Sequence, residues 1–322
     1  MKILMIGSDN PWRMEAAVER ALRRAGHTTL LIDDRRMKRL IGWKLTQLWA
    51  LFQAQRFQAD FVFLSKCLAL DPGTVAEIIA GRPNAMWYHD PQWHRDLDRP
   101  DIAHIASIGR LAQVFFVTGF EDEWRAHGLP ARFLPAAGDA GITPVPPDER
   151  FASSVAFIGT GYDAERANLL VAVASHHSLR VWGEGWEQWR GTLDWSGRPV
   201  EGQEFAAVCS SSDIVLGINP ARAAGGVSYT SDRTWMVMLA GGFFLAPKTP
   251  GVSAMLREGE HCAFYDDVES CVAECGRWLG DAGRREQVRR AGERFVREHH
   301  TYDQRIGNIL ENREFVNPLA AA

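Results

Sequence analysis

The sequence predicts an α/β protein with two Rossmann-like halves, and three observations carry this prediction. Short apolar segments alternate with helix-like segments along residues 1–134, as is typical of a parallel sheet covered on both faces. The same alternation starts again at residue 155. Between the two runs, residues 139–150 contain three prolines and no clear period, as expected of a linker. The length of 322 residues fits two domains of about 150 residues each.

The first half opens with an apolar strand that ends at Gly7, and the helix after it stops at Gly26. Proline stands in the first turn of the predicted helices at 11–25 and 72–80, where it costs no hydrogen bond. The apolar runs predict strands at 2–6, 28–32, 61–64, 85–88, 114–117 and 131–134. The segments between them predict helices at 11–25, 38–55, 72–80, 102–109 and 121–127.

The second half repeats this pattern and then ends in helices. Strands are predicted at 155–158, 180–182, 214–217 and 243–245, and helices at 164–175, 203–210 and 234–240. Three closing helices are predicted at 268–279, 284–298 and 302–311. In the first of them, Val268, Val272, Cys275 and Leu279 form an apolar stripe at helical spacing.

Composition narrows the choice of function. The net charge of −4 gives no reason to expect nucleic acid or an anionic membrane as a partner. No apolar run approaches the ~20 residues that span a bilayer, so no integral membrane association is expected. The N-terminus is expected to be a first strand and not a signal peptide, and the five scattered cysteines suit a reducing cytoplasm. The oligomeric state stays open.

A polar run before the predicted helix at 234–240 is the first candidate site. It contains Tyr229, Thr230, Ser231, Asp232 and Arg233. Backbone N–H groups at a helix start lack partners within the helix and carry partial positive charge, so with a guanidinium nearby they can cradle a diphosphate. An ordinary N-cap with a solvated arginine explains the same residues.

A glycine turn opens the second half. Gly159, Gly161 and Ala164 spell Gly-x-Gly-x-x-Ala between a strand and a helix, and Glu184 ends the next strand. This order fits a dinucleotide-binding fingerprint. An NAD-dependent oxidoreductase is therefore one hypothesis for the function.

Several motifs resemble the glycosyltransferases related to the spore maturation protein CgeB. The resemblance spans residues 55–312 loosely and 228–310 well. Its motifs are Trp87-Tyr88-His89-Asp90-Pro91, Leu134-Pro135-Ala136-Ala137-Gly138-Asp139, Phe157-Ile158-Gly159-Thr160-Gly161, Gly183-Glu184-Gly185-Trp186, and Arg233 followed by Gly241-Gly242.

The resemblance implies the GT-B fold, with two Rossmann-like domains facing a cleft and a C-terminal helix that crosses back to the first domain. We expect an acceptor domain at 1–140, a nucleotide-sugar donor domain at 141–300, and the crossing helix and tail at 301–322. The implied activity is metal-independent glycosyl transfer, and the family's likeness to retaining GT-B enzymes implies retention at the anomeric carbon. A nucleotide-diphosphate sugar would be the co-substrate, with no cofactor, and the acceptor is unidentified.

The resemblance also implies roles for individual residues. Arg233 would stabilise the departing diphosphate, and Trp186 would stack on the base or pack in the core. The implied donor-binding residues are Gly159, Gly161, Glu184, Trp186, Tyr229, Thr230, Ser231, Asp232 and Arg233.

On the acceptor side, Asp90 would orient or deprotonate the acceptor hydroxyl, with His89 or His94 as an alternative base. Asp90 capping a turn before Pro91 is the plainer explanation, and metal ligation by this cluster is a weaker one. The loop with Gly7, Ser8 and Asn10 would contact the acceptor, although a simple strand-to-helix connection also explains it.

One position departs from the family pattern. The family glutamate three residues after the arginine, which binds the donor ribose, is Met236 here. Asp232 or Glu184 could take over the ribose. Otherwise donor recognition has changed, or the chain is a non-catalytic GT-B protein that binds a nucleotide.

Overall fold

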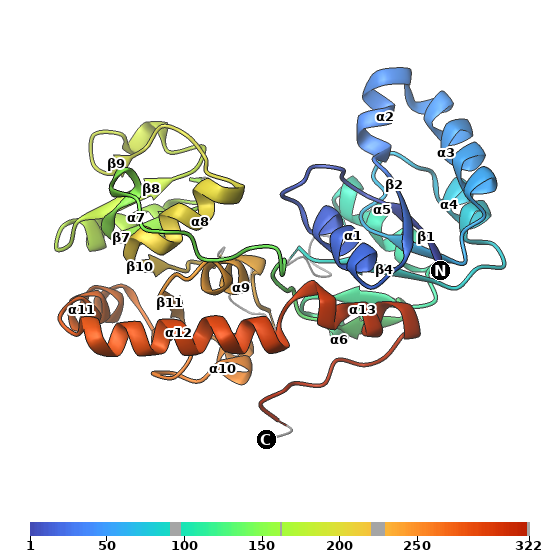
Figure 1. The fold of residues 1–322 in the computed structure, drawn as a ribbon. Helices are drawn as coiled ribbons and strands as arrows, with labels where there is room; N and C mark the ends of the chain where they lie inside the picture. The colour runs from blue at the N-terminus through green and yellow to red at the C-terminus, as the bar shows by residue number, and fades with distance from the viewer. Residues whose placement is uncertain (91–97, 162, 220–228, 321–322) are drawn as a thin grey trace. The chain divides into compact units, whose positions relative to one another are not determined.

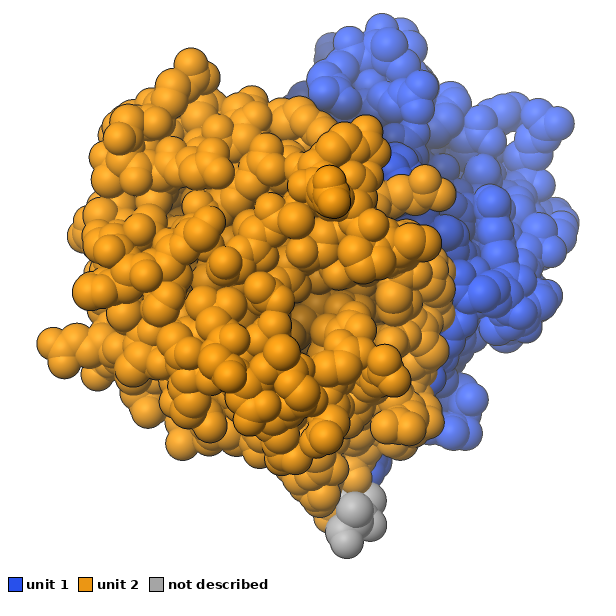
Figure 2. Space-filling model, turned by 60° about the vertical axis from the view of Figure 1, so that its left-hand side comes forward, with its two compact units in different colours: residues 1–136, 302–316 blue, residues 137–301, 317–322 orange. Residues whose placement is uncertain are grey.

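The structure is a computed structural model that describes residues 1–90, 98–161, 163–219 and 229–320 (Figure 1). The chain divides into two compact units, coloured separately in Figure 2. Unit 1 comprises residues 1–136 and 302–316, and unit 2 comprises residues 137–301 and 317–322. The chain therefore leaves unit 1 after residue 136, returns to it at the last helix and leaves it again after residue 316.

Unit 1 contains a six-stranded parallel sheet in the order β2-β1-β3-β4-β5-β6. Its strands are β1 (Lys2–Ile6), β2 (Thr28–Ile32), β3 (Phe61–Leu64), β4 (Asn84–Tyr88), β5 (Phe115–Val117) and β6 (Ala131–Phe133). The order reverses at β1, which pairs with β2 on one side and β3 on the other. In open α/β sheets, the carboxyl ends of strands at such a reversal open into a crevice that binds ligands.

The helices of unit 1 are α1 (Met14–Arg24), α2 (Asp34–Ile41), α3 (Trp43–Phe57), α4 (Pro72–Ile79), α5 (Pro100–Gly109), α6 (Glu121–Ala126) and α13 (Tyr302–Glu311). The single helix predicted at 38–55 is wrong, because two helices occupy this segment. Gly42 separates them with a φ of 78°, a conformation that only glycine adopts without strain.

Helix α13 is part of unit 1 although it lies far along the chain. It packs against α1, and Arg24 makes two hydrogen bonds to Asp303 at 2.8 and 2.7 Å. The ring of Tyr302 meets Trp87 edge-on, with their centroids 5.9 Å apart. The Nε of Arg305 donates to the carbonyl of Pro135 at 3.2 Å.

Unit 2 repeats the architecture with the strand order β12-β11-β10-β7-β8-β9, again all parallel. The strands are β7 (Ser153–Ile158), β8 (Leu179–Trp182), β9 (Asp194–Trp195), β10 (Ser212–Leu216), β11 (Phe244–Pro247) and β12 (Ala263–Tyr265). Here the order reverses at β7, between β8 and β10. The loops after β7, β8 and β10 therefore meet at one edge of the sheet.

The helices of unit 2 are α7 (Ala164–Ala174), α8 (Gly202–Ser211), α9 (Asp232–Leu239), α10 (Pro250–Met255), α11 (Val268–Leu279) and α12 (Ala282–His299). The sequence prediction missed the short elements β9, α10 and β12. Elements of two to six residues contain too few positions for a period to show.

Each unit has its own core. Tyr88, Phe115 and Trp124 are buried together in unit 1, and Phe157, Trp186 and Phe243 are buried in unit 2. The predicted α/β class is thus confirmed. None of the helices in the described part of the chain combines the length and the apolar character needed to cross a membrane.

Candidate functional site

The carboxyl ends of β7 and β8 form an interlocked glycine turn in unit 2. The N–H of Gly161 donates to the carbonyl of Glu184 at 2.8 Å. Gly183 has a φ of 141°, and a Cβ added there would lie 2.1 Å from the carbonyl oxygen of Gly159. Only glycine fits at Gly183. The hydrogen bond and this close contact hold the loops after β7 and β8 against each other.

Trp186 supports this turn from inside. Its side chain is fully buried, and its Nε1 donates to the carbonyl of Gly159 at 2.7 Å. The ring meets Phe157 edge-on, with centroids 5.9 Å apart. Trp186 was expected either to stack on the nucleotide base or to pack in the core. In this arrangement it packs in the core, and the buried ring offers no face to a base. Glu184 beside it is exposed.

Arg233 lies against the same turn. It is the second residue of α9, whose N-cap Ser231 accepts a hydrogen bond from the Arg233 N–H at 3.3 Å. The guanidinium carbon is 5.4 Å from the centroid of the Phe157 ring. A Cβ added at Gly159 would lie 2.8 Å from Nη2 of Arg233. The missing side chain of Gly159 therefore makes room for the guanidinium.

Arg166 was missed by the sequence reasoning. This buried arginine of α7 donates from Nη1 to the carbonyl of Thr160 at 2.6 Å and from Nη2 to the carbonyl of Ile218 at 3.3 Å. Its guanidinium carbon is 5.5 Å from the centroid of Phe157. Two cations thus gather at the end of β7. A bound anion would offset their repulsion.

The polar run at 229–233 leads into α9 and lies within the described residues. Tyr229 and Thr230 are buried. The hydroxyl of Thr230 has no hydrogen-bond partner among residues 1–90, 98–161, 163–219 and 229–320. Asp232 is exposed, and one of its oxygens accepts from the N–H of Arg233 at 2.8 Å. Met236 follows Asp232 by one helical turn and is half-buried, so Asp232 is the carboxylate on α9 nearest to the position of the missing glutamate.

Unit 1 contains a separate cavity of about 1380 Å³ at the carboxyl ends of its first four strands. Gly7, Ser8 and Asn10 line it, as do Lys66 and His89. The loop after β1 is also a compact connection, because the hydroxyl of Ser8 accepts from the N–H of Asn10 at 3.3 Å. The same residues therefore form a compact strand-to-helix connection and line the cavity in which an acceptor contact is expected.

Asp90 and His89 follow β4. The Nζ of Lys66 lies 2.5 Å from one oxygen of Asp90, and Nε2 of His89 lies 4.0 Å from the other. Lys66 was not among the expected residues, because its partner is distant in sequence. His94 falls outside the described residues. Within the described residues, no group of three or more His, Cys, Asp or Glu side chains could hold a metal ion.

The wall of this cavity carries six lysines and arginines and five acidic residues. Arg13, Arg35, Lys38 and Arg39 are exposed there without an ion pair among the described residues. Asp34, one of the acidic residues of the wall, is engaged within the protein. Asp34 is buried and accepts from the N–H of Ala69 at 2.6 Å, and burial raises its pKa above the ordinary value. The cavity can therefore accommodate an acceptor with anionic groups.

Comparison with known proteins identifies the fold. Residues 166–311 match the model of a family described as glycosyl transferase-like. HepE from Anabaena, solved with UDP, superposes with a TM-score of 0.65 at 11% identity, covering 97% of this chain and 100% of that one. Sucrose-phosphate synthase from Thermosynechococcus elongatus gives 0.64 at 14% identity, with 100% of each chain covered.

An α-glucosyltransferase solved with UDP-glucose and DNA gives a TM-score of 0.64 at 10% identity, covering 94% of this chain and 96% of that one. No curated protein matches the sequence. The GT-B fold and the glycosyltransferase assignment are thereby confirmed, whereas the narrower likeness to CgeB stays a prediction. The chain has the GT-B fold and carries a glycosyl transferase-like domain over residues 166–311.

Proposed function

We propose that this protein transfers a sugar from a nucleotide-diphosphate donor to a hydroxyl group of an acceptor. Unit 2 would bind the donor, and the cavity of unit 1 would bind the acceptor. The observation that carries the proposal is the pair of guanidinium groups, Arg166 and Arg233, gathered on Phe157 beside the glycine turn. A guanidinium and a helix N-terminus are suitable partners for phosphate oxygens.

In the reaction, the bond between the anomeric carbon and the diphosphate oxygen breaks, and the acceptor oxygen bonds to the same carbon. The diphosphate leaves with the bonding electrons and gains negative charge. Arg233 and the N–H groups at the start of α9 would stabilise that charge, and this supports our proposal of a metal-independent reaction. The same arrangement needs no cofactor besides the donor.

The acceptor hydroxyl must lose a proton during transfer. We assign this role to Asp90, with His89 as the alternative, since Lys66 and His89 both lie beside the Asp90 carboxylate. Retention at the anomeric carbon remains our proposal, based on the resemblance to retaining GT-B enzymes. The anomeric proton coupling of the product would test it.

We also propose a cytoplasmic location. The five cysteines are buried free thiols, as suits a reducing compartment. HepE has been solved with UDP-glucose, which makes UDP-glucose the first donor to test.

Thermal unfolding with UDP, GDP, dTDP, CMP and NAD(H) tests the donor site. A nucleoside diphosphate should raise the melting temperature of the wild type and of the control Arg294→Ala, because Arg294 is exposed on α12. In Arg233→Ala the affinity should fall roughly 10- to 100-fold, as expected for losing hydrogen bonds to a charged group. Sugar transfer should slow about 100-fold or more.

Other outcomes would lead elsewhere. Stabilisation by NAD(H) alone would favour the oxidoreductase hypothesis. Diphosphate binding without any sugar transfer would favour a non-catalytic nucleotide-binding protein. Equal behaviour of Arg233→Ala and Arg294→Ala would contradict the assigned role of Arg233.

A further inference from the structure

Helix α3 has large apolar side chains on its outer face. Leu45, Leu48 and Phe52 are 57%, 64% and 57% exposed. Their spacing of three and four residues places them on one side of the helix, and we call them the apolar stripe. On the preceding α2, Leu40 is also exposed, at 67%.

The inner face of α3 explains why the stripe points outward. Thr46, Gln47, Ala50 and Ala54 are the buried residues of this helix. The side chain of Gln47 donates to the carbonyl of Ala69 at 2.8 Å and accepts from the N–H of Asp71 at 2.9 Å. Rotating the stripe into the core would break these buried hydrogen bonds. The helix orientation is therefore fixed with the stripe exposed.

The segment of chain that carries the stripe has charges of a single sign. Residues 35–59 contain six lysines and arginines and no aspartate or glutamate. Arg36 pairs with Asp9. The other five are exposed and have no ion pair among the described residues; they are Arg35, Lys38, Arg39, Lys44 and Arg56. We call the apolar stripe together with these five cations the basic face.

We propose that the basic face docks unit 1 onto an anionic membrane surface. A helix with leucine and phenylalanine on one side, flanked by cations, can insert its apolar side chains among lipid headgroups while the cations contact anionic lipids. The bound helix lies in the plane of the interface, so no membrane-spanning segment is needed.

Two other occupants fit the basic face less well. A second copy of the chain in a two-fold contact would bring like charges together. Nucleic acid would satisfy the cations and leave the apolar stripe in water. The docking proposal does not depend on the proposed sugar transfer, although Arg35, Lys38 and Arg39 belong to both the basic face and the wall of the cavity.

Co-sedimentation with lipid vesicles tests the proposal on the full chain. The wild type should pellet with vesicles that contain phosphatidylglycerol and stay in solution with phosphatidylcholine alone. Leu45→Gln/Leu48→Gln should weaken binding by at least ~10-fold, because both side chains lose their favourable burial. Val268→Gln/Val316→Gln removes exposed apolar surface elsewhere, at side chains 41% and 72% exposed, and should bind like the wild type.

Charge reversal provides a second, independent variant. Lys44→Glu/Arg56→Glu should weaken binding by roughly 5-fold or more for each position, and added salt should reduce the difference. Arg190→Glu/Arg294→Glu changes the same charge on unit 2 and should have little effect. Circular dichroism should show that all variants are folded.

Three results would overturn the proposal. The first is a wild type that does not bind phosphatidylglycerol vesicles. The second is binding of the basic-face variants that equals that of their controls. The third is a dimer in sedimentation velocity that Leu45→Gln/Leu48→Gln converts to a monomer, in which case the stripe is an interface between copies of the chain.

Discussion

Gly183 shows how one residue holds the candidate donor site in shape. It combines a φ of 141° with a space that already contains the carbonyl oxygen of Gly159, 2.1 Å from where a Cβ would lie. The carbonyl of Gly183 also accepts a hydrogen bond from Nε1 of Trp195 at 2.7 Å. Moving this backbone would therefore disturb the turn on which Arg233 rests.

Gly183→Ala should destabilise unit 2 by roughly 2 kcal/mol or more, because it adds both backbone strain and a steric clash. Gly191→Ala is the matched control, since a Cβ at Gly191 has nothing within 4 Å and its φ is not positive. Urea unfolding of both variants would measure the difference. Equal midpoints would show that the turn adapts easily and does not position Arg233.

At the scale of single residues, the sequence pattern predicted part of the candidate donor site. Gly159, Gly161 and Arg233 follow a strand or begin a helix, and each position is visible in the sequence. Arg166 and Lys66 were not predictable in this way. Their partners, the carbonyl of Ile218 and the carboxylate of Asp90, lie 52 and 24 residues away and come near only in the folded chain.

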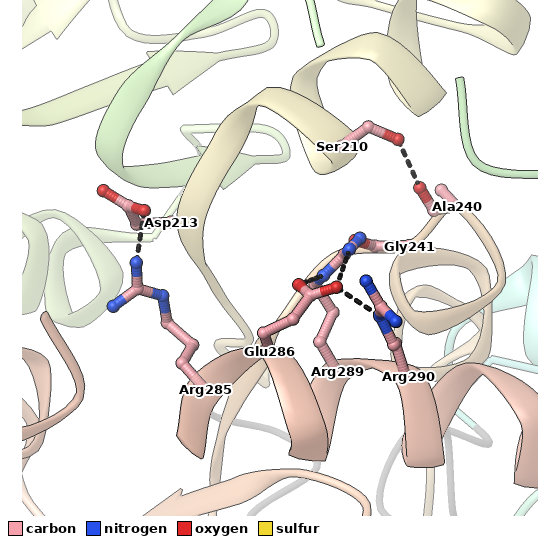
Figure 3. A network of polar contacts seen from close by, with 8 residues as sticks. All are labelled: Ser210, Asp213, Ala240, Gly241, Arg285, Glu286, Arg289 and Arg290. Carbon is pink, nitrogen blue, oxygen red and sulfur yellow. Dashed lines mark hydrogen bonds and ion pairs between the residues drawn. The ribbon is translucent and has the colours of Figure 1, made fainter. Parts of the chain in front are cut away.

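At the scale of elements, α12 supports the turn that ends α9 (Figure 3). Arg289 donates to the carbonyl of Gly241 at 2.6 Å while its Nε contacts Glu286 at 2.6 Å. Arg290 also donates to Glu286. Hydrogen bonding from Arg289 is the main reason that the pKa of Glu286 falls to about 2. The carboxylate thus holds in place the arginine that anchors the C-terminal end of α9.

Glu286→Gln should lower the free energy of unfolding near neutral pH by about 0.5–1 kcal/mol, because Glu286 is partly exposed and solvent screens the pair. The folded-state pKa is depressed from 4.5 to about 2, so this stabilisation is present above pH 4.5 and is lost as the pH falls toward 2. Urea unfolding should show the wild type and the variant converging over that range. Glu187→Gln, an exposed residue without an ion pair among the described residues, should show no such trend.

The element scale also shows where periodicity fails as a guide. Apolar residues lie on all sides of α3, so the sequence predicts a helix but does not mark one side of it as facing the core. In the structure the smaller residues Ala50 and Ala54 face inward while Leu48 and Phe52 face outward. The sequence pattern reveals the helix, but it does not reveal which face the rest of the unit covers.

For the molecule as a whole, the net charge concealed a local cluster of positive charge. The net charge of −4 gave no reason to expect an anionic membrane, yet residues 35–59 carry six cations and no carboxylate. The two-fold α/β alternation, by contrast, predicted both sheets, because every strand-helix repeat contributes to it.

The division into units leads to a prediction about separate pieces of the chain. Residues 137–301 are continuous and contain all of β7–β12 and α7–α12, so this piece should fold and bind the nucleoside diphosphate on its own. Residues 1–136 lack α13, whose Tyr302, Ile306 and Ile309 are buried within unit 1. Burial of three such side chains contributes about 5 kcal/mol, which is comparable to the whole stability of a small domain.

Residues 1–136 alone should therefore be unfolded or close to unfolding, and a peptide of residues 302–316 should restore the fold when added in excess. Circular dichroism and urea unfolding of the piece, with and without the peptide, would measure this. A peptide in which Tyr302 and Ile309 are replaced by alanine is the control, and it should bind much more weakly. If residues 1–136 alone unfolded at the same urea concentration as unit 1 of the intact chain, α13 would contribute little to unit 1. The return of the chain at residue 302 would then need another explanation.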